Sequence, residues 1–261
     1  MTASVHTIDV AAGFQPNPVL VKGEGPPLVY LHGLLGQEWD GLLDGLSATR
    51  RVHAPAHAGA DEPDDLRGIS GMHDLILYYD DVLDALGLDR IDLVGHSFGG
   101  MVAAEIAAAR PDRVRRLVLI DALGLWRDDA PVADYLLVPS DKQAALLLGD
   151  PNSDAVRARL ALPDDPEQRI TQTLRRTTSM ASITHFLWPI PERGLSQRLR
   201  RIKAPTLVVW GAEDRLVPSV YARDFAGAIA SARIEMIAGA GHTPHFPDCR
   251  TVLDKVAAFL A

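Results

Sequence analysis

A serine flanked by small residues stands where an apolar run gives way to an alanine-rich stretch. The residues Gly95-His96-Ser97-Phe98-Gly99 follow the apolar run 91–94 and precede the alanine-rich run 100–110. When a strand turns into a helix within one residue, the central residue is strained, and small neighbours let the two elements pass each other. The turn would hold the Ser97 hydroxyl at the positive end of the helix, where developing negative charge is stabilised. The pattern therefore predicts a nucleophilic serine.

A serine hydroxyl at neutral pH needs a general base, and that base needs an acid to hold its tautomer. For a nucleophile on a strand-to-helix turn, the chain order is serine, acid, histidine. The histidines that follow Ser97 are His185, His242 and His245. We predict His242 as the base because it lies in a loop just past the last expected strand. His245 is expected to line the site or pack beneath it, and His185 lies in an inserted segment.

The acid has one preferred candidate and two alternatives. Asp214 lies in a loop that follows the apolar run 206–210, at the strand edge where catalytic groups collect in open parallel sheets. Asp121 ends the preceding expected strand and also lies between the serine and His242 in sequence, although a turn or helix cap would explain it equally. Glu213 is the other alternative. The sequence predicts Asp214 and leaves these two open.

Two backbone N–H groups are needed to hold the oxyanion of a tetrahedral intermediate. The N–H of Phe98, directly after the nucleophile, can supply one, and the loop after the strand 28–31 can supply the other through Leu34. His32 precedes the nucleophile in the chain, so we expect it to organise this loop by hydrogen bonding. His96, inside the serine turn, is likewise expected to be structural.

Large side chains near these positions are candidates to line a substrate pocket. Leu34 and Phe98 would present their side chains to the acyl group, and Leu35 would lie beside them. Trp126 and Trp188 bracket an inserted segment and could wall a hydrophobic pocket. The two tryptophans could equally pack that segment onto the sheet, because aromatic side chains often serve in cores.

Apolar runs of strand character recur along the chain, and stretches of helical periodicity lie between several of them. Gly87 and Pro111 end two of the expected helices. The order strand, helix, strand, helix, strand predicts parallel strands joined by crossover helices. The expected strands are residues 28–31, 52–56, 91–94, 113–120, 206–210 and 233–237, and the expected helices are 72–86, 99–110 and 251–260.

The alternation of expected strands and helices stops between residues 123 and 201. Helical fragments at 142–148 and 155–162 are broken by prolines, Pro166 among them, and no buried strand is evident. A segment of this kind between two strands predicts a helical cap that covers the catalytic face, rather than an independent domain.

Composition limits the class of protein. A chain of 261 residues with 47% hydrophobic and 23% charged residues suits one α/β domain spanning 1–261. The lone cysteine, Cys249, cannot form an internal disulfide, and neither a signal peptide nor a membrane span is evident, so a cytoplasmic protein is expected. The net charge of −8 argues against nucleic acid as a partner, and the oligomeric state stays open.

No cofactor or metal is expected from the patterns present. The glycines of 96–100 form neither a dinucleotide-binding nor a phosphate-binding pattern. His53, His57 and Asp61 are spaced four apart, but Pro55 and Gly59 between them prevent a shared helical face. A small organic molecule is the expected partner.

Four ordered motifs resemble the α/β-hydrolase fold superfamily, and the likeness spans nearly the whole chain. The motifs are HGLLG at 32–36, GHSFGG at 95–100, PTLVVWGAEDRLVP at 205–218 and GAGH at 239–242. The resemblance implies an eight-stranded, mostly parallel sheet flanked by helices, with a helical cap inserted after the sixth strand. It also implies a Ser-Asp-His triad on Ser97, Asp214 and His242.

Within this superfamily the sequence looks most like bacterial cofactor-free esterases and carbon–carbon bond hydrolases of ring-fission products. The leading hypothesis is hydrolysis of a carboxylic ester, or a similar acyl bond, of a small and largely apolar substrate through an acyl-enzyme. Cleavage of a vinylogous diketone acid is the alternative, although Leu34-Leu35 departs from the small-residue loop usual in those hydrolases. A non-catalytic receptor for a small ligand on the same fold is an alternative of another class.

Overall fold

A central β-sheet organises the molecule, for which the computed structural model describes residues 3–188 and 192–261. Within these ranges eight strands form one sheet in the order β1-β2-β4-β3-β5-β6-β7-β8. β1 and β2 are antiparallel to their neighbours, and the pairings from β4 through β8 are parallel. The strands are β1 (Ser4–Ile8), β2 (Asn17–Lys22), β3 (Pro27–Leu31), β4 (Arg51–Pro55), β5 (Ile91–His96), β6 (Val114–Ile120), β7 (Thr206–Gly211) and β8 (Ala232–Ile237). The expected eight-stranded, mostly parallel sheet is confirmed.

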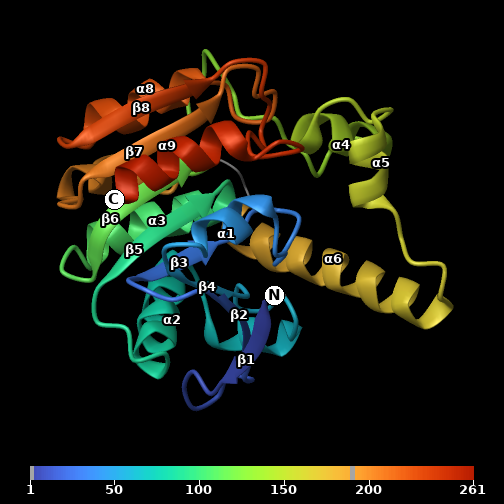
Figure 1. The fold of residues 1–261 in the computed structure, drawn as a ribbon, viewed down its shortest axis with the longest axis horizontal. Helices are drawn as coiled ribbons and strands as arrows, with labels where there is room; N and C mark the ends of the chain where they lie inside the picture. The colour runs from blue at the N-terminus through green and yellow to red at the C-terminus, as the bar shows by residue number, and fades with distance from the viewer. Residues whose placement is uncertain (1–2, 189–191) are drawn as a thin grey trace.

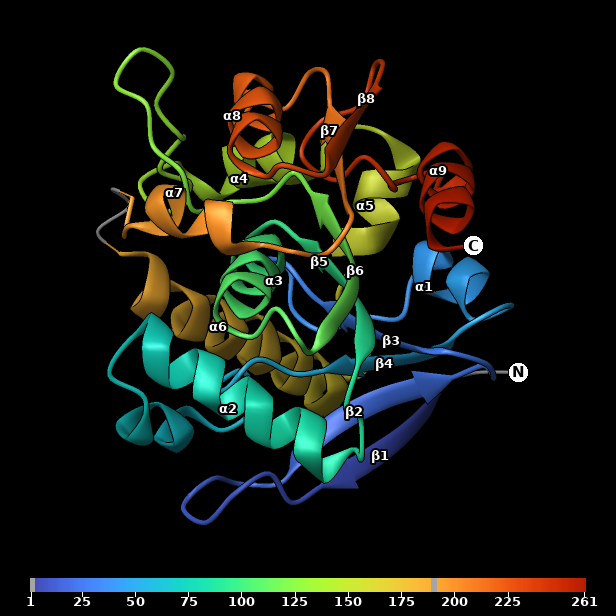
Figure 2. The ribbon, with the colours of Figure 1, turned by 90° about the vertical axis from the view of Figure 1, so that its left-hand side faces the viewer.

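Helices cover both faces of the sheet, as Figure 2 shows. α1 (Gly41–Leu46) and α9 (Arg250–Leu260) pack on one face, where they share a core with the sheet. α2 (Met72–Ala85), α3 (Phe98–Ala109) and α8 (Val220–Ala228) pack on the other face in a larger core. The remaining helices are the 3₁₀ turns η1 (Pro63–Gly68) and η2 (Leu199–Arg201), with α4 (Ser140–Leu148), α5 (Asp154–Leu160), α6 (Pro166–Leu187) and α7 (Leu195–Arg198).

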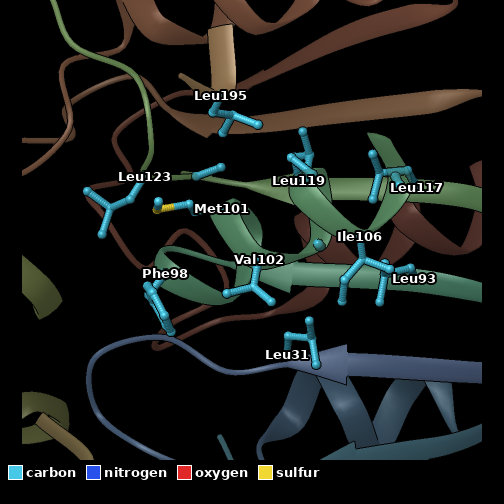
Figure 3. Close-up of a cluster of buried hydrophobic side chains, with 14 of the residues drawn as sticks. Leu31, Leu93, Phe98, Met101, Val102, Ile106, Leu117, Leu119, Leu123 and Leu195 are labelled. Atoms are coloured by element: carbon cyan, nitrogen blue, oxygen red, sulfur yellow. The ribbon is translucent and has the colours of Figure 1, made fainter. Parts of the chain in front are cut away.

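The helix that begins at the serine turn is buried along almost its whole length. Figure 3 shows side chains of α3, among them Met101, Val102 and Ile106, packed against the strand residues Leu93 and Leu119. Its alanines allow close approach to the sheet, and burial of each larger apolar side chain contributes about 1.5 to 3 kcal/mol. The helix is therefore held firmly against the sheet, and its first turn is fixed in position.

The serine turn depends on glycines because other backbone lies against it. A Cβ added at Gly95 would lie 2.2 Å from the Gly99 carbonyl oxygen, and one at Gly99 would lie 2.1 Å from the Leu31 oxygen. The Gly99 N–H also donates to the His32 carbonyl at 3.1 Å, which joins the turn to the loop after β3. The crossing of β5 and α3 thus leaves no room for a side chain at either glycine.

Replacing Gly99 with alanine is expected to lower the free energy of unfolding by about 3 kcal/mol, because the new methyl group meets immobile backbone. Gly227→Ala, on α8, is the matched control, since a Cβ there meets nothing within 4 Å. The control should change stability by less than about 1 kcal/mol, toward greater stability. Urea unfolding of both variants measures the difference, and equal stabilities would contradict this packing.

The segment between β6 and β7 carries helices that gather at one edge of the sheet, where Figure 1 shows α4, α5 and α6. α6 contacts the sheet domain through Ser182, whose hydroxyl donates to the Ala58 carbonyl at 2.5 Å. The return to the sheet is anchored where Arg198 of α7 forms two hydrogen bonds, at 2.7 and 2.6 Å, with the buried Glu105 of α3. The expected insertion after the sixth strand is thus helical in its described part.

Pro166 begins a helix, so its expected role as a break was wrong. Asp165 is the N-cap of α6 and accepts a hydrogen bond from the Gln168 N–H at 2.9 Å, and Pro166 occupies the first helical turn. Proline is favoured there because the missing N–H would have had no partner in the helix. Among the described residues, no helix is both long enough and apolar enough to cross a bilayer.

Candidate active site

Ser97 lies at the junction of β5 and α3, with φ 57° and ψ −118°, and its side chain is fully buried. Its N–H donates to the Ile120 carbonyl at 2.9 Å, and its carbonyl accepts from the N–H groups of Met101 and Leu123 at 3.1 Å. A non-glycine residue with positive φ is strained, and such strain persists only where the surroundings enforce it. These three hydrogen bonds hold the strained serine turn between β6 and α3.

The structure brings Ser97, His242 and Asp214 together. His242 Nε2 lies 2.8 Å from Ser97 Oγ, and His242 Nδ1 lies 2.8 Å from Asp214 Oδ2. All three side chains are buried. An imidazole held by a carboxylate on one nitrogen and facing a hydroxyl on the other can take the hydroxyl proton and stabilise the resulting charge. The arrangement is chemically able to activate the serine.

The loops after β7 and β8 are tied together, which sets Asp214 opposite His242. Glu213 N–H donates to the Ala240 carbonyl at 2.9 Å, and a Cβ added at Gly211 would lie 2.1 Å from the Gly241 oxygen. Asp214 Oδ1 accepts from two backbone N–H groups of its own loop, those of residues 216 and 217, at 2.8 and 2.9 Å. The Glu213 side chain is exposed and takes no part in these contacts to His242.

A second carboxyl group, that of Asp121, is buried beside this pair at the end of β6. Its Oδ1 accepts from the Gly211 N–H at 2.9 Å, and its backbone has φ 43°. Burial, and then the nearby charge of Asp214, raise the pKa of Asp121 well above its ordinary value. His242 therefore contacts Asp214 directly, whereas Asp121 contacts the backbone at the end of β7.

The loop after β3 lies directly against the serine. A Cβ added at Gly33 would lie 3.0 Å from Ser97 Cβ. In the ranges 3–188 and 192–261, the N–H groups of Leu34 and Phe98 donate to no protein acceptor. Neither N–H is therefore engaged within the described chain, and the expected oxyanion hole stays a prediction.

Buried histidines support this loop in their neutral form. His32 Nδ1 donates to the Gly33 carbonyl at 3.0 Å, and His32 Nε2 accepts from the His57 N–H at 3.2 Å. Burial lowers the pKa of His32 to about 4, so one neutral tautomer satisfies both contacts. His96 Nε2 donates to the His242 carbonyl at 2.8 Å, and burial lowers the pKa of His96 as well. Both side chains occupy the supporting positions expected of them.

A cavity opens at Ser97 and is bounded partly by the cap. Leu34 and Leu35 line it, together with the polar side chains Arg159 and His245. His185 lies apart from this cavity's lining and donates from Nε2 to the carbonyl of residue 69 at 3.1 Å.

Trp126 and Trp188, the two candidates to wall a substrate pocket, are not among the residues that line the Ser97 cavity in the described part of the chain. Trp188 lines a separate cavity of about 350 Å³ with apolar neighbours that include Leu123 and Leu216. Trp126 is half-buried against the core and donates from its indole nitrogen to Asp128 at 2.9 Å. Of the two, Trp188 therefore borders an apolar cavity, and Trp126 packs against the larger core.

Sequence patterns placed His245 at the site, but they did not indicate the rest of the charged wall of the Ser97 cavity. Arg159 of α5 pairs with Glu38 at 2.8 Å, and His245 Nε2 lies 3.3 Å from Asp40 Oδ2. Burial opposes ionisation of Asp40, but the hydrogen bonds from His245 and Leu43 outweigh it and lower the pKa of this carboxyl. A capping signal before the helix 41–46 could have located Asp40, whereas nothing local marks the pairing of Arg159 with a residue 121 positions away.

A metal could in principle use the carboxylates of Asp121 and Asp214 with His242, whose ligand atoms lie within 4.8 Å of one another. It is the one such grouping found in the described part of the chain. His242 already bonds Asp214 and Ser97 through its two ring nitrogens. Hydrogen bonding therefore accounts for the cluster, and the prediction that no metal is needed stands as a prediction.

Comparison with known proteins gives the family of the chain. Residues 26–248 match the family model described as the alpha/beta hydrolase fold. A 2-hydroxy-6-oxo-2,4-heptadienoate hydrolase of Pseudomonas putida is 29% identical over 276 residues, covering 100% of this chain and 98% of that protein. A protein of Pseudomonas savastanoi pv. phaseolicola provisionally named carbamate hydrolase RutD is 30% identical over 253 residues, covering 90% and 95% of the two chains.

Among solved structures, a bacterial membrane phospholipase A superposes with a TM-score of 0.79 at 21% identity, covering 99% of this chain and 86% of that one. At this identity the likeness concerns the fold. Since the family model covers residues 26–248 of the 261, the chain belongs to the α/β-hydrolase fold family.

Proposed function

We propose that the protein is a serine hydrolase that cleaves a carboxylic ester, or a similar acyl bond, of a small and largely apolar molecule. One observation carries the proposal: an unbroken line of hydrogen bonds, each 2.8 Å long, from Ser97 Oγ through His242 to Asp214. The N–H groups of Leu34 and Phe98, which donate to no acceptor within residues 3–188 and 192–261, support it.

In the proposed reaction, His242 Nε2 takes the Ser97 proton as Oγ attacks the carbonyl carbon. The N–H groups of Leu34 and Phe98 donate to the oxyanion, and Asp214 stabilises the imidazolium. The imidazolium then protonates the leaving oxygen, which departs as an alcohol and leaves an acyl group on Ser97. Water attacks this ester with His242 as base, so the acid is released and the serine hydroxyl is restored.

The linings of the cavities indicate which parts of a substrate they suit. Leu34 and Leu35 give the space at Ser97 an apolar side, and Arg159 and His245 give it a polar side. A separate apolar cavity is lined in part by Leu123, whose N–H donates to the Ser97 carbonyl. An apolar acyl group in the second space and a more polar leaving group toward Arg159 would suit the two linings.

Carbon–carbon bond cleavage is the second candidate. The observation that favours it is the relative from Pseudomonas putida, which is named as a hydrolase of 2-hydroxy-6-oxo-2,4-heptadienoate and matches over the whole chain. The same serine, histidine and oxyanion groups could serve either bond, so the polarity and shape of the cap-lined cavity would decide between them. The carbamate name of the second relative adds a third acyl bond worth assaying.

A substrate panel tests the choice. Purified protein is assayed with short-chain p-nitrophenyl esters, an aryl carbamate and 2-hydroxy-6-oxo-2,4-heptadienoate, each beside Ser97→Ala as the background. We expect the largest kcat/KM on an ester. A larger kcat/KM on the dienoate would replace the ester proposal with carbon–carbon cleavage, and ligand binding with no turnover of any of them would favour the receptor alternative.

A further inference from the structure

Two carboxyl groups are buried side by side behind the proposed base. The side chains of Asp121 and Asp214 are shielded from solvent, and their oxygens lie within 4.8 Å of each other and of a His242 ring nitrogen. Ionisation of two carboxyl groups this close in a buried site is strongly disfavoured, because little solvent reaches them to compensate the second charge. One of the two is therefore expected to carry a proton at neutral pH.

The hydrogen bonds decide which one. Asp214 accepts three, from two backbone N–H groups at 2.8 and 2.9 Å and from His242 Nδ1 at 2.8 Å. Asp121 accepts one, from the Gly211 N–H to Oδ1, and in the described ranges its Oδ2 is buried with no donor. Hydrogen bonds to an ionised carboxylate stabilise the charge, so Asp214 keeps it. A proton on Asp121 Oδ2 would turn this unpaired oxygen into a donor.

We propose that Asp121 is a positioning residue, a neutral carboxylic acid that donates a hydrogen bond to the Asp214 carboxylate while accepting one from the end of β7. The raised pKa of Asp121, caused by burial and by Asp214, agrees with this geometry. Asp121 acts through Asp214 and His242 and does not touch the reacting atoms.

The backbone conformation of Asp121 also supports a positioning role. Asp121 has φ 43°, the left-handed region that costs free energy for residues other than glycine, although Asp and Asn tolerate it best. Its N–H continues the sheet by donating to the Val209 carbonyl at 3.0 Å, while its side chain reaches Gly211 two residues further along β7. The chain therefore adopts a strained turn here that directs the carboxyl group at the start of the Asp214 loop.

The expected consequence is that Asp121, acting through Asp214, influences the protonation state of His242. A neutral donor on Asp214 lowers the basicity of that carboxylate and fixes its orientation, so the proton stays on His242 Nδ1. The titratable groups around Asp121 are Asp214 from the β7 loop and His242 from the β8 loop. The His96 ring lies beyond them, with its centroid 5.3 Å from that of His242. Without the Asp121 donor, the charge on Asp214 is less dispersed and protonated His242 is favoured.

Two substitutions of Asp121 distinguish a hydrogen-bonding role of its side chain from a purely structural one. Asp121→Asn keeps an acceptor for Gly211 and an N–H donor for Asp214, and asparagine tolerates the same φ. Asp121→Gly removes the carboxyl group but relieves the backbone strain, so it should fold. We expect the glycine variant to lose about 10- to 100-fold in kcat/KM on an ester, as for one lost hydrogen bond to a charged group, and its acid limb to move to higher pH. The asparagine variant should rescue both to near the wild-type values.

An infrared measurement checks the proton without any substrate. The difference spectrum between wild type and Asp121→Asn at pH 7 should contain the band of a protonated carboxyl group, shifted in heavy water. Because this band does not depend on the proposed chemistry, its presence with an inactive wild type would remove the proposed function and leave the proton on Asp121 in place. Absence of the band would overturn the inference. So would an asparagine variant as impaired as the glycine variant, or a folded glycine variant with wild-type kinetics and pH profile.

Discussion

Ser97→Ala is expected to reduce kcat for ester hydrolysis by about a millionfold, the scale seen when the nucleophile of a serine triad is removed. Without Oγ no acyl-enzyme can form, and His242 is left with no hydroxyl to activate. Because Ser97 lies in a turn fixed by three backbone hydrogen bonds, the fold should survive the loss of the hydroxyl. Steady-state kinetics beside a thermal melt measures both effects.

Ser179→Ala is the matched control. Ser179 is also buried, on α6, and its hydroxyl lacks a partner among the described residues, but it lines a different cavity. We expect this variant to turn over esters at the wild-type rate. Turnover retained by Ser97→Ala, or lost equally in both variants, would contradict the assignment of the nucleophile.

Asp214→Asn is expected to lower kcat by about ten-thousandfold, by analogy with the aspartate of a serine protease triad. An asparagine amide facing His242 Nδ1 favours the wrong tautomer, so Nε2 carries a proton and cannot accept the one from Ser97. The Leu216 and Val217 N–H groups would still find an amide oxygen, so the loop should keep its shape. Kinetics with p-nitrophenyl esters across pH measures the loss.

The neighbouring residue supplies the control for this variant. Glu213→Gln removes an exposed carboxylate one position away and should leave kcat nearly unchanged. If Glu213→Gln or Asp121→Asn produced the large loss and Asp214→Asn did not, the acid would have been assigned to the wrong carboxyl group.

The core of the site could be predicted from sequence because its residues follow strand ends. Ser97, Asp214 and His242 each come directly after, or a few residues after, a strand in the parallel part of the sheet, and such positions meet at one edge. The structure brings these three together, and their catalytic roles stay predictions. The choice between Asp121 and Asp214 needed coordinates, because both follow neighbouring strands and only hydrogen bonding distinguishes them.

Several elements, among them β1, β2 and α6, were not predicted from the apolar periodicity of the sequence. Residues of β1 are exposed along most of the strand, so no apolar alternation marks it. β2 was not predicted either, although its residues alternate between buried and half-buried. The long helix α6 exposes Ile170 and Leu174 and buries few side chains, so its amphipathic pattern is weak. The charged wall of the cavity was hidden for another reason, since the pair Arg159 and Glu38 depends on how the cap sits over the sheet.

The most direct test of the central claim is to identify the atom that becomes covalently modified. Wild-type protein is treated with a fluorophosphonate, digested and sequenced by mass spectrometry, with the Ser179→Ala and Ser97→Ala variants in parallel. The account predicts a single phosphonate on Ser97 in the wild type and in Ser179→Ala, and none in Ser97→Ala. A phosphonate on another residue, or ester turnover that continues in protein whose Ser97 peptide stays unmodified under complete labelling, would contradict it.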